Sequence, residues 1–278
     1  MKSNPFIILS AAFLTSFSVN AQTLHLPPTP QFRATDIPSH IYSGEWEFFV
    51  GGGIAVFDCN DDQRPEIYGA GGEGQASLMV NQSSADKIAF AKNTPENLAL
   101  TSVTGAYPLD IDSDGILDLA ILRLGQNKLM KGLGNCQFGA FDTAMPLPLA
   151  QTWTTAFSAT WEGDAQLPTL AFGNYIDRSD PDGPFESCDT SYLMRPIGDR
   201  YGPPFALDPG FCTLSMLFSD WGRNGRADLR VSNDRHYYVR NGAEQLWAMG
   251  TTPTLYTAED GWVDYSLWGM GIASRDIT

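Results

Sequence analysis

The sequence has few of the residues on which many enzymes and nucleic-acid-binding proteins depend. Among its 278 residues are 3 histidines, and 17 lysines and arginines face 32 aspartates and glutamates, a formal net charge of −15 at pH 7. A phosphate backbone or an anionic membrane surface would be repelled by this charge. We therefore expect no nucleic-acid partner, and the balance favours cations.

Several catalytic signatures are also missing. The chain contains no GxSxG, no HExxH and no GxxxxGK[ST], so serine-hydrolase, zinc-protease and nucleotide hypotheses have no supporting motif. We expect no catalytic residues. One enzymatic alternative stays open, a carbohydrate-active hydrolase or lyase, because 32 acidic residues supply many possible carboxylate pairs.

Long apolar runs are missing after the first 21 residues. That opening segment combines Lys2, an apolar run over 6–17 and the small-residue sequence VNA at 19–21. This pattern is typical of a secretory signal peptide cleaved after Ala21, and the run is too short to cross a bilayer. The sequence predicts a secreted or periplasmic protein with no membrane span, and a Pro-containing lead-in over 22–50.

Cysteine is scarce, and its spacing excludes a CxxC zinc or thioredoxin-type motif. Four cysteines in an exported chain make disulfides plausible. Cys188 and Cys212 bracket a Pro/Gly-rich insertion, so we favour a bridge between them. Cys59 and Cys136 would then form a second pair or remain buried thiols.

What the sequence does contain is a recurring acidic motif. Its clearest copy is PLDIDSDGILDL at 108–119, and related copies begin at Asp58, Asp220 and, in degraded form, Thr160. Asp276 follows GMGIAS as Asp58 follows GGGIAVF, so it resembles the opening of a fifth copy. A period of about 50–60 residues indicates an array of similar supersecondary units.

Each unit has the pattern of a short β-meander. In the second copy, strands are predicted over 106–110, 118–124, 128–133 and 137–141, separated by Gly/Asn turns. Blades of about four strands arranged radially make a β-propeller. We expect an all-β propeller over 51–278, with units starting near 51, 103, 153, 213 and 268. This would be an incomplete ring of four blades and the start of a fifth, from a truncated chain. A solenoid or a pair of sandwiches is the alternative architecture.

The acidic loop of the second copy predicts a calcium site. It places side-chain oxygens at positions one, three, five and nine, a backbone carbonyl at seven and glycine at six, which suits a hard cation that takes six to eight oxygens. The predicted ligands are Asp110, Asp112, Asp114, the Ile116 carbonyl and Asp118. An EF-hand is rejected, because position twelve is Ile121 within a strand-like run. An acidic turn without metal is the alternative.

The other copies keep fewer ligands. The first offers Asp58, Asn60, Asp62 and Glu66, with Gln63 in place of glycine. The fourth offers Asp220, Asn224 and Asp228, with Gly222 at position three and two arginines nearby. The third aligns only Glu162 and Asp164, with an extra residue at Leu167, and is interpreted as a metal-free turn.

With these repeats, the chain resembles the FG-GAP/VCBS repeat proteins, and among them the secreted cartilage-acidic-protein-like (ASPIC/UnbV-associated) group. The resemblance covers about 51–278 and rests on GGGIAVFDCNDDQRPEIYGAG, PLDIDSDGILDLAIL, LSMLFSDWGRNGRADLRVSNDRHYYV and LWGMGIASRD. It implies calcium-loop propellers, commonly seven-bladed, that bind an extracellular protein or polysaccharide rather than catalyse a reaction.

Three further features are left open. The stretch 231–240, which contains His236, is interpreted as a solvent-facing hairpin, with a ligand-binding mouth as the alternative. His25 and His40 are expected in exposed loops. Seven scattered tryptophans are expected to pack between blades, although one or two exposed ones could stack on sugar rings.

Overall fold

The computed structural model describes residues 29, 32, 34–141, 147, 151–234, 239–240 and 242–275. The chain divides into a unit over 1–35 and a compact unit over 36–278, and the second is described below. The predicted signal peptide, His25, His236 with its neighbours at 235–238, and Asp276 lie outside the described residues. Within them, no helix has the length and apolar character that a bilayer crossing requires.

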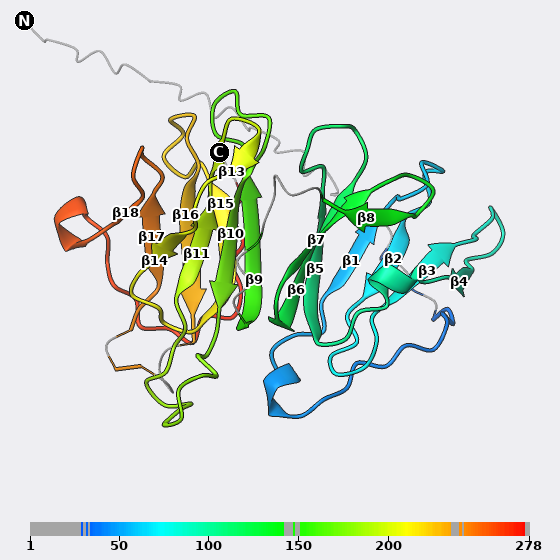
Figure 1. The fold of residues 1–278 in the computed structure, drawn as a ribbon, viewed down its shortest axis with the longest axis horizontal. Coiled ribbons are helices and arrows are strands. Elements are labelled where there is room, and N and C mark those ends of the chain that lie inside the picture. The colour runs from blue at the N-terminus through cyan, green and yellow to red at the C-terminus, as the bar shows by residue number, and fades with distance from the viewer. Residues whose placement is uncertain are drawn as a thin grey trace, which may run out of the picture. The chain divides into compact units, whose positions relative to one another are not determined.

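The prediction of an all-β chain is confirmed. Four antiparallel four-stranded sheets follow one another along the chain, and Figure 1 shows them as successive groups of arrows; pairing of β6 with β9 joins the second and third into one eight-stranded sheet. Their strands are β1 (Ile54–Phe57), β2 (Glu66–Gly69), β3 (Ser77–Asn81) and β4 (Phe90–Lys92); β5 (Val103–Leu109), β6 (Asp118–Gly125), β7 (Lys128–Gly132) and β8 (Phe138–Ala140); β9 (Thr152–Thr160), β10 (Thr169–Asn174), β11 (Ser191–Met194) and β14 (Phe205–Leu207); and β15 (Thr213–Ser219), β16 (Asp228–Asn233), β17 (Gln245–Ala248) and β18 (Thr254–Leu255).

Smaller elements join these sheets. A hairpin of β12 (Pro196–Ile197) and β13 (Arg200–Tyr201) extends from the third sheet, and β6 also pairs with β9 through Leu124↔Trp153. Three short 3₁₀ helices are η1 (Trp46–Phe48), η2 (Glu96–Leu98) and η3 (Ala258–Asp260).

The sheets are arranged as propeller blades. Their first strands are spatial neighbours in chain order: β1 contacts β5, β5 contacts β9, and β9 contacts β15. Separate apolar cores lie between the first and second, second and third, and third and fourth sheets. Face-to-face packing of consecutive sheets around shared inner strands is the radial arrangement of a β-propeller.

Strand β6 shows why the sequence gives this packing. Leu119 and Ile121 contact the core shared with the first sheet, whereas Ala120 and Leu122 contact the core shared with the third. Because successive side chains alternate between the faces of a strand, burial of both faces requires a continuous apolar run. Each fully buried aliphatic side chain contributes about 1.5–3 kcal/mol to this packing.

Two disulfides connect neighbouring blades. The favoured bridge, Cys188 to Cys212, is confirmed, and it ties the insertion of the third blade to the start of β15. Cys59 and Cys136 form the second pair, which was left open, and it ties the first acidic loop to the turn before β8. Two disulfides fit an oxidising compartment.

Candidate metal centre

The four acidic loops occupy equivalent places, because each connects the first strand of a blade to the second. The closing pairs are Phe57↔Glu66, Leu109↔Asp118, Thr160↔Thr169 and Ser219↔Asp228. Eight residues therefore separate the paired positions in every loop, and position nine is always the first residue of the second strand.

This register corrects the alignment of the third copy. Trp161, not Thr160, takes position one, so Glu162 and Asp164 stand at positions two and four and align with none of the ligand positions. No extra residue is present at Leu167. The two acidic residues suggest a frame that starts at Thr160, but the pairing of Thr160 with Thr169 moves the start to Trp161.

The turn in the second loop is built around the carboxylate of Asp110. Its Oδ1 accepts a hydrogen bond from the backbone N–H of Asp114 at 3.1 Å, and its Oδ2 accepts one from Gly115 at 2.9 Å. Ser113 and Gly115 both take positive φ, 59° and 85°. Wrapping the chain around one carboxylate thus requires the left-handed region at positions four and six, which only glycine adopts at little cost.

The first and fourth loops have the same backbone. Asp58 accepts hydrogen bonds from the N–H groups of Asp62 and Gln63, and Asp220 does so from Asn224 and Gly225. The positive φ values recur at positions four and six: Asp61, 59°; Gln63, 63°; Arg223, 49°; Gly225, 80°. Gln63 therefore takes the conformation that glycine has in the other two loops.

Only part of the predicted ligand set comes together in the second loop. Asp110, Asp112 and Asp118 each present an oxygen, and these oxygens lie within 4.8 Å of one another. Asp112 Oδ1 is buried and accepts no hydrogen bond. Asp114 is not in this group: its Oδ1 accepts from the N–H of Ile116 at 2.9 Å. An unpartnered buried carboxylate oxygen beside two other carboxylates is a fit for a hard cation.

A counter-charge that the sequence reasoning missed comes from β7. Lys131 Nζ donates to Asp112 Oδ2, and to Asp114 Oδ2 at 2.7 Å. These contacts raise the pKa of Lys131 and, together with the Ile116 N–H, hold the pKa of Asp114 below its usual range. Strand register could have found this residue, since pairing of Leu119 with Met130 puts Lys131 beside the loop.

The carboxylate at position nine has a structural role. Asp118 is fully buried and accepts one hydrogen bond from the N–H of Ile111 and one from Gly132, both at 2.7 Å. Burial raises the pKa of Asp118 to about 6, against the opposing effect of these two hydrogen bonds; Asp112 and Asp114 raise it further. This residue therefore joins its loop to the third strand of the blade.

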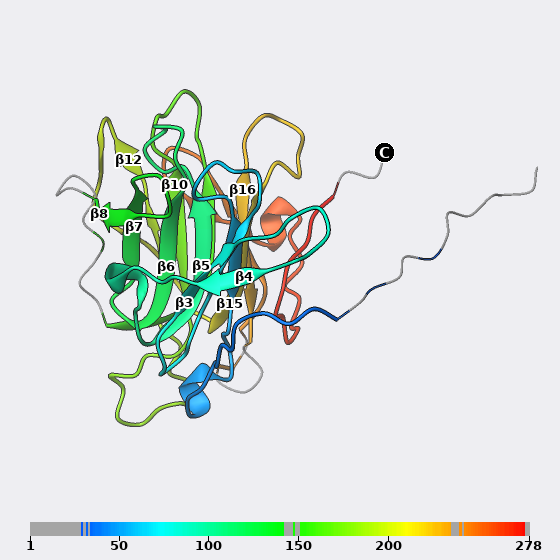
Figure 2. The ribbon, with the colours of Figure 1, turned by 90° about the vertical axis from the view of Figure 1, so that its right-hand side faces the viewer.

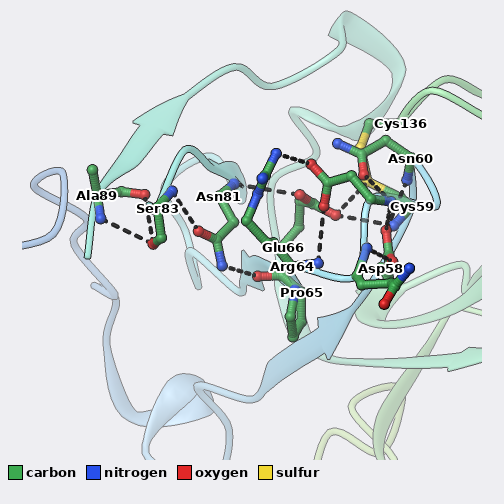
Figure 3. Close-up of polar contacts among 12 residues, drawn as sticks. Asp58, Cys59, Asn60, Arg64, Pro65, Glu66, Asn81, Ser83, Ala89 and Cys136 are labelled. Carbon is green, nitrogen blue, oxygen red and sulfur yellow. Dashed lines mark hydrogen bonds and ion pairs between the residues drawn. A yellow bond between two sulfur atoms is a disulfide. The ribbon is translucent and has the colours of Figure 1, made fainter. Parts of the chain in front are cut away.

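The first loop uses Glu66 in the same way, as Figure 3 shows. Glu66 accepts from the N–H of Cys59 at 2.9 Å and from that of Asn81 at 3.3 Å, and Asp62 pairs with Arg64 at 2.7 Å. Within the described part of the chain, the carboxylates of this loop do not gather as those of the second loop do.

In the third loop an acidic side chain pairs with an arginine. Arg195 directly follows Met194, the last residue of β11, which pairs with Leu170 as Met130 pairs with Leu119; Arg195 thus corresponds to Lys131. It donates to both oxygens of Glu162, at 2.9 and 2.7 Å. This fits the interpretation of the loop as a metal-free turn.

In the fourth loop the position-nine carboxylate, Asp228, accepts hydrogen bonds from one backbone N–H and two aromatic side chains. Asp228 Oδ1 accepts from the N–H of Met249 at 3.0 Å, and Oδ2 accepts from Trp221 Nε1 and the Tyr256 hydroxyl, both at 3.1 Å. Arg226 also lies 3.3 Å from Asp228. As in the first loop, its acidic side chains form no close group among the residues that the structure describes.

Comparison with known proteins adds a distant likeness among solved structures. No family model matches the chain, and no curated protein matches it. Among solved structures, the fold is similar to a chain in the "Crystal structure of BBS1N in complex with ARL6DN, soaked with lead", with a TM-score of 0.43 and 12% sequence identity. The match covers 77% of this chain and 57% of that chain, so this chain spans less than two thirds of the solved one.

Proposed function

We propose that this protein is an exported β-propeller of FG-GAP/VCBS-type blades whose second acidic loop holds a calcium ion, and that it acts as a binding module outside the cytoplasm. Asp112 Oδ1 carries the proposal, because it is a buried carboxylate oxygen without a hydrogen bond, within 4.8 Å of oxygens of two further carboxylates.

Charge repulsion in the second loop supports a divalent ion. Two carboxylates about 4.8 Å apart repel each other by about 3.5 kcal/mol at an effective dielectric constant of 20. Lys131 offsets only one of the four negative charges in the loop, those of Asp110, Asp112, Asp114 and Asp118. A divalent cation held by Asp110, Asp112 and Asp118 would offset two.

The ligand chemistry favours calcium over magnesium. Calcium accepts six to eight oxygens in a flexible shell, whereas magnesium requires a near-ideal octahedron. A loop that supplies carboxylates, a backbone carbonyl and access to water suits the flexible shell. The ion would neutralise the loop between β5 and β6, so ion binding and folding should be coupled.

A thermal melt with and without calcium tests the proposal. Calcium at about 100 times its Kd should stabilise the fold by about 2.7 kcal/mol, which raises Tm by roughly 5–11 °C for a unit of this size. Asp112→Asn should abolish most of this rise. Asp164→Asn, in the third loop, is the matched control and should leave it unchanged. A Tm that calcium and EDTA do not change would refute the proposal.

The carbohydrate-active enzyme remains the alternative function. Incubation with polysaccharides, followed by assay for new reducing ends or unsaturated sugars, separates it from a binding module. The proposal predicts no turnover.

A further inference from the structure

A pocket lies on the face of the fourth sheet that is turned away from the third. In β16, Leu229 and Val231 pack into the core shared with the third sheet, and Asp228 and Arg230 project from the opposite face. The segment after β18 covers that face and is seen beside β16 in Figure 2. Between them is a cavity of about 220 Å³. This volume is below the about 300–1,000 Å³ of pockets for drug-sized ligands, and suits one small ring.

Two aromatic walls of the pocket are fixed by a single carboxylate. Asp228 Oδ2 accepts from Trp221 Nε1 and from the Tyr256 hydroxyl, and the two rings are 6.1 Å apart at 75°. Trp221 is 58% exposed. In the first two loops the position-nine carboxylate accepts from a backbone N–H at position two, whereas here it accepts from the side chain at that position. The fourth loop therefore orients aromatic rings with the carboxylate that elsewhere closes a turn.

The third wall supplies unused polar groups. Trp262 Nε1 is buried and donates no hydrogen bond, and the Arg230 guanidinium lies 5.4 Å from the centre of the Trp262 ring. Arg230 forms no salt bridge or side-chain hydrogen bond with another described residue. Asp260 accepts from Thr257 only through Oδ2, so no described residue donates to Oδ1. The pocket thus combines free donors, a free acceptor and flat apolar faces.

We propose that this pocket binds one sugar ring of a saccharide ligand. A pyranose ring presents an apolar C–H face, which packs on an aromatic ring, and a rim of hydroxyls that both donate and accept hydrogen bonds. Trp221 is the exposed stacking platform, Arg230 donates to ring hydroxyls, and Asp260 accepts from them. A purely apolar ligand would leave the guanidinium and the carboxylate desolvated without partners. The inference goes beyond the calcium proposal, because no residue of the second loop lines the pocket.

The test is calorimetric titration of the full exported chain with glucose, galactose, N-acetylglucosamine and glucuronate. At least one should bind with a Kd in the millimolar range or tighter. Trp221→Ala and Arg230→Ala should each weaken that binding at least tenfold with little change in Tm, since both side chains lie outside the apolar cores. Trp161→Ala, an exposed tryptophan of the third loop, is the matched control and should not change it.

The same titration in EDTA separates this inference from the calcium proposal, because sugar affinity should be equal with and without calcium. The inference is overturned if none of the four sugars binds, if Trp221→Ala and Arg230→Ala bind as the parent does, or if binding is lost in EDTA.

Discussion

Replacement of Lys131 by methionine discriminates best between a cation site and a self-contained acidic turn. Lys131 and a calcium ion would compete for Asp112, because the lysine already contacts that carboxylate, and it contacts Asp114 as well. Methionine keeps an unbranched side chain of similar length and removes the charge. Without calcium, the Lys131→Met variant should be less stable than the parent protein. When calcium is added, the variant should bind the ion more tightly than the parent does.

The magnitude follows from the two ion pairs. All three side chains are partly exposed, so each pair contributes no more than about 1 kcal/mol. Calcium binding to the parent must turn Lys131 away from Asp112, which breaks that pair and rearranges the pair with Asp114 at a cost of about 1–2 kcal/mol. Removal of this cost should tighten calcium binding by roughly five- to thirty-fold, since 1.4 kcal/mol is a factor of ten.

Calorimetric calcium titrations of the parent and of Lys131→Met measure this ratio. Lys128→Met, on the same strand, is the matched control and should leave calcium affinity unchanged within twofold. If Lys131→Met lowers Tm and calcium does not restore it, the lysine alone neutralises the loop and the argument for a cation is refuted.

Three further predictions concern stability. Gln63→Gly should raise the free energy of unfolding by about 0.5–1 kcal/mol in urea titrations. The left-handed conformation costs a residue with a side chain about 1–2 kcal/mol, and the greater loss of chain entropy by glycine on folding offsets part of the gain. A decrease in the free energy of unfolding would contradict this reasoning. Replacement of Cys59 and Cys136 by alanine should cost roughly 2–4 kcal/mol, since the bridge closes a loop across 77 residues; an unchanged urea midpoint would contradict that mechanism. Burial and the nearby charge of Asp177 raise the pKa of Asp189 to about 6. Between about pH 4 and 6 the folded state therefore binds more protons than the unfolded state, and stability falls as pH rises. Asp189→Asn should reduce this slope, and an equal slope in both proteins would count against the assignment.

Strand order and the place of the acidic loops could be predicted from sequence, because both depend on short local patterns of apolar residues, aspartate and glycine. The second blade illustrates this: strands expected over 118–124 and 128–133 are found as β6 and β7, since apolar runs bounded by aspartate and glycine set their ends. The recurrence of the motif then gave the number of sheets among the described residues.

What could not be predicted depends on register between strands. Lys131 reaches the loop from the third strand, 13 residues after Asp118, and only the pairing of β6 with β7 brings them together. The shift in the third loop has the same origin, because the closing pair Thr160↔Thr169 defines its frame.

The pocket on the fourth sheet was also invisible in the sequence. Its residues come from β16, from the loop before it and from the segment after β18, and only the fold assembles them. The sequence showed scattered tryptophans, and it gave no sign that Asp228 would accept hydrogen bonds from Trp221 and Tyr256.

A crystal structure of the parent protein grown in millimolar calcium tests the central claim most directly. The account predicts an ion at about 2.3–2.6 Å from oxygens of Asp110, Asp112 and Asp118, with Lys131 turned away from Asp112. Lys131 still joined to both Asp112 and Asp114, with no ion among the carboxylates, would contradict it.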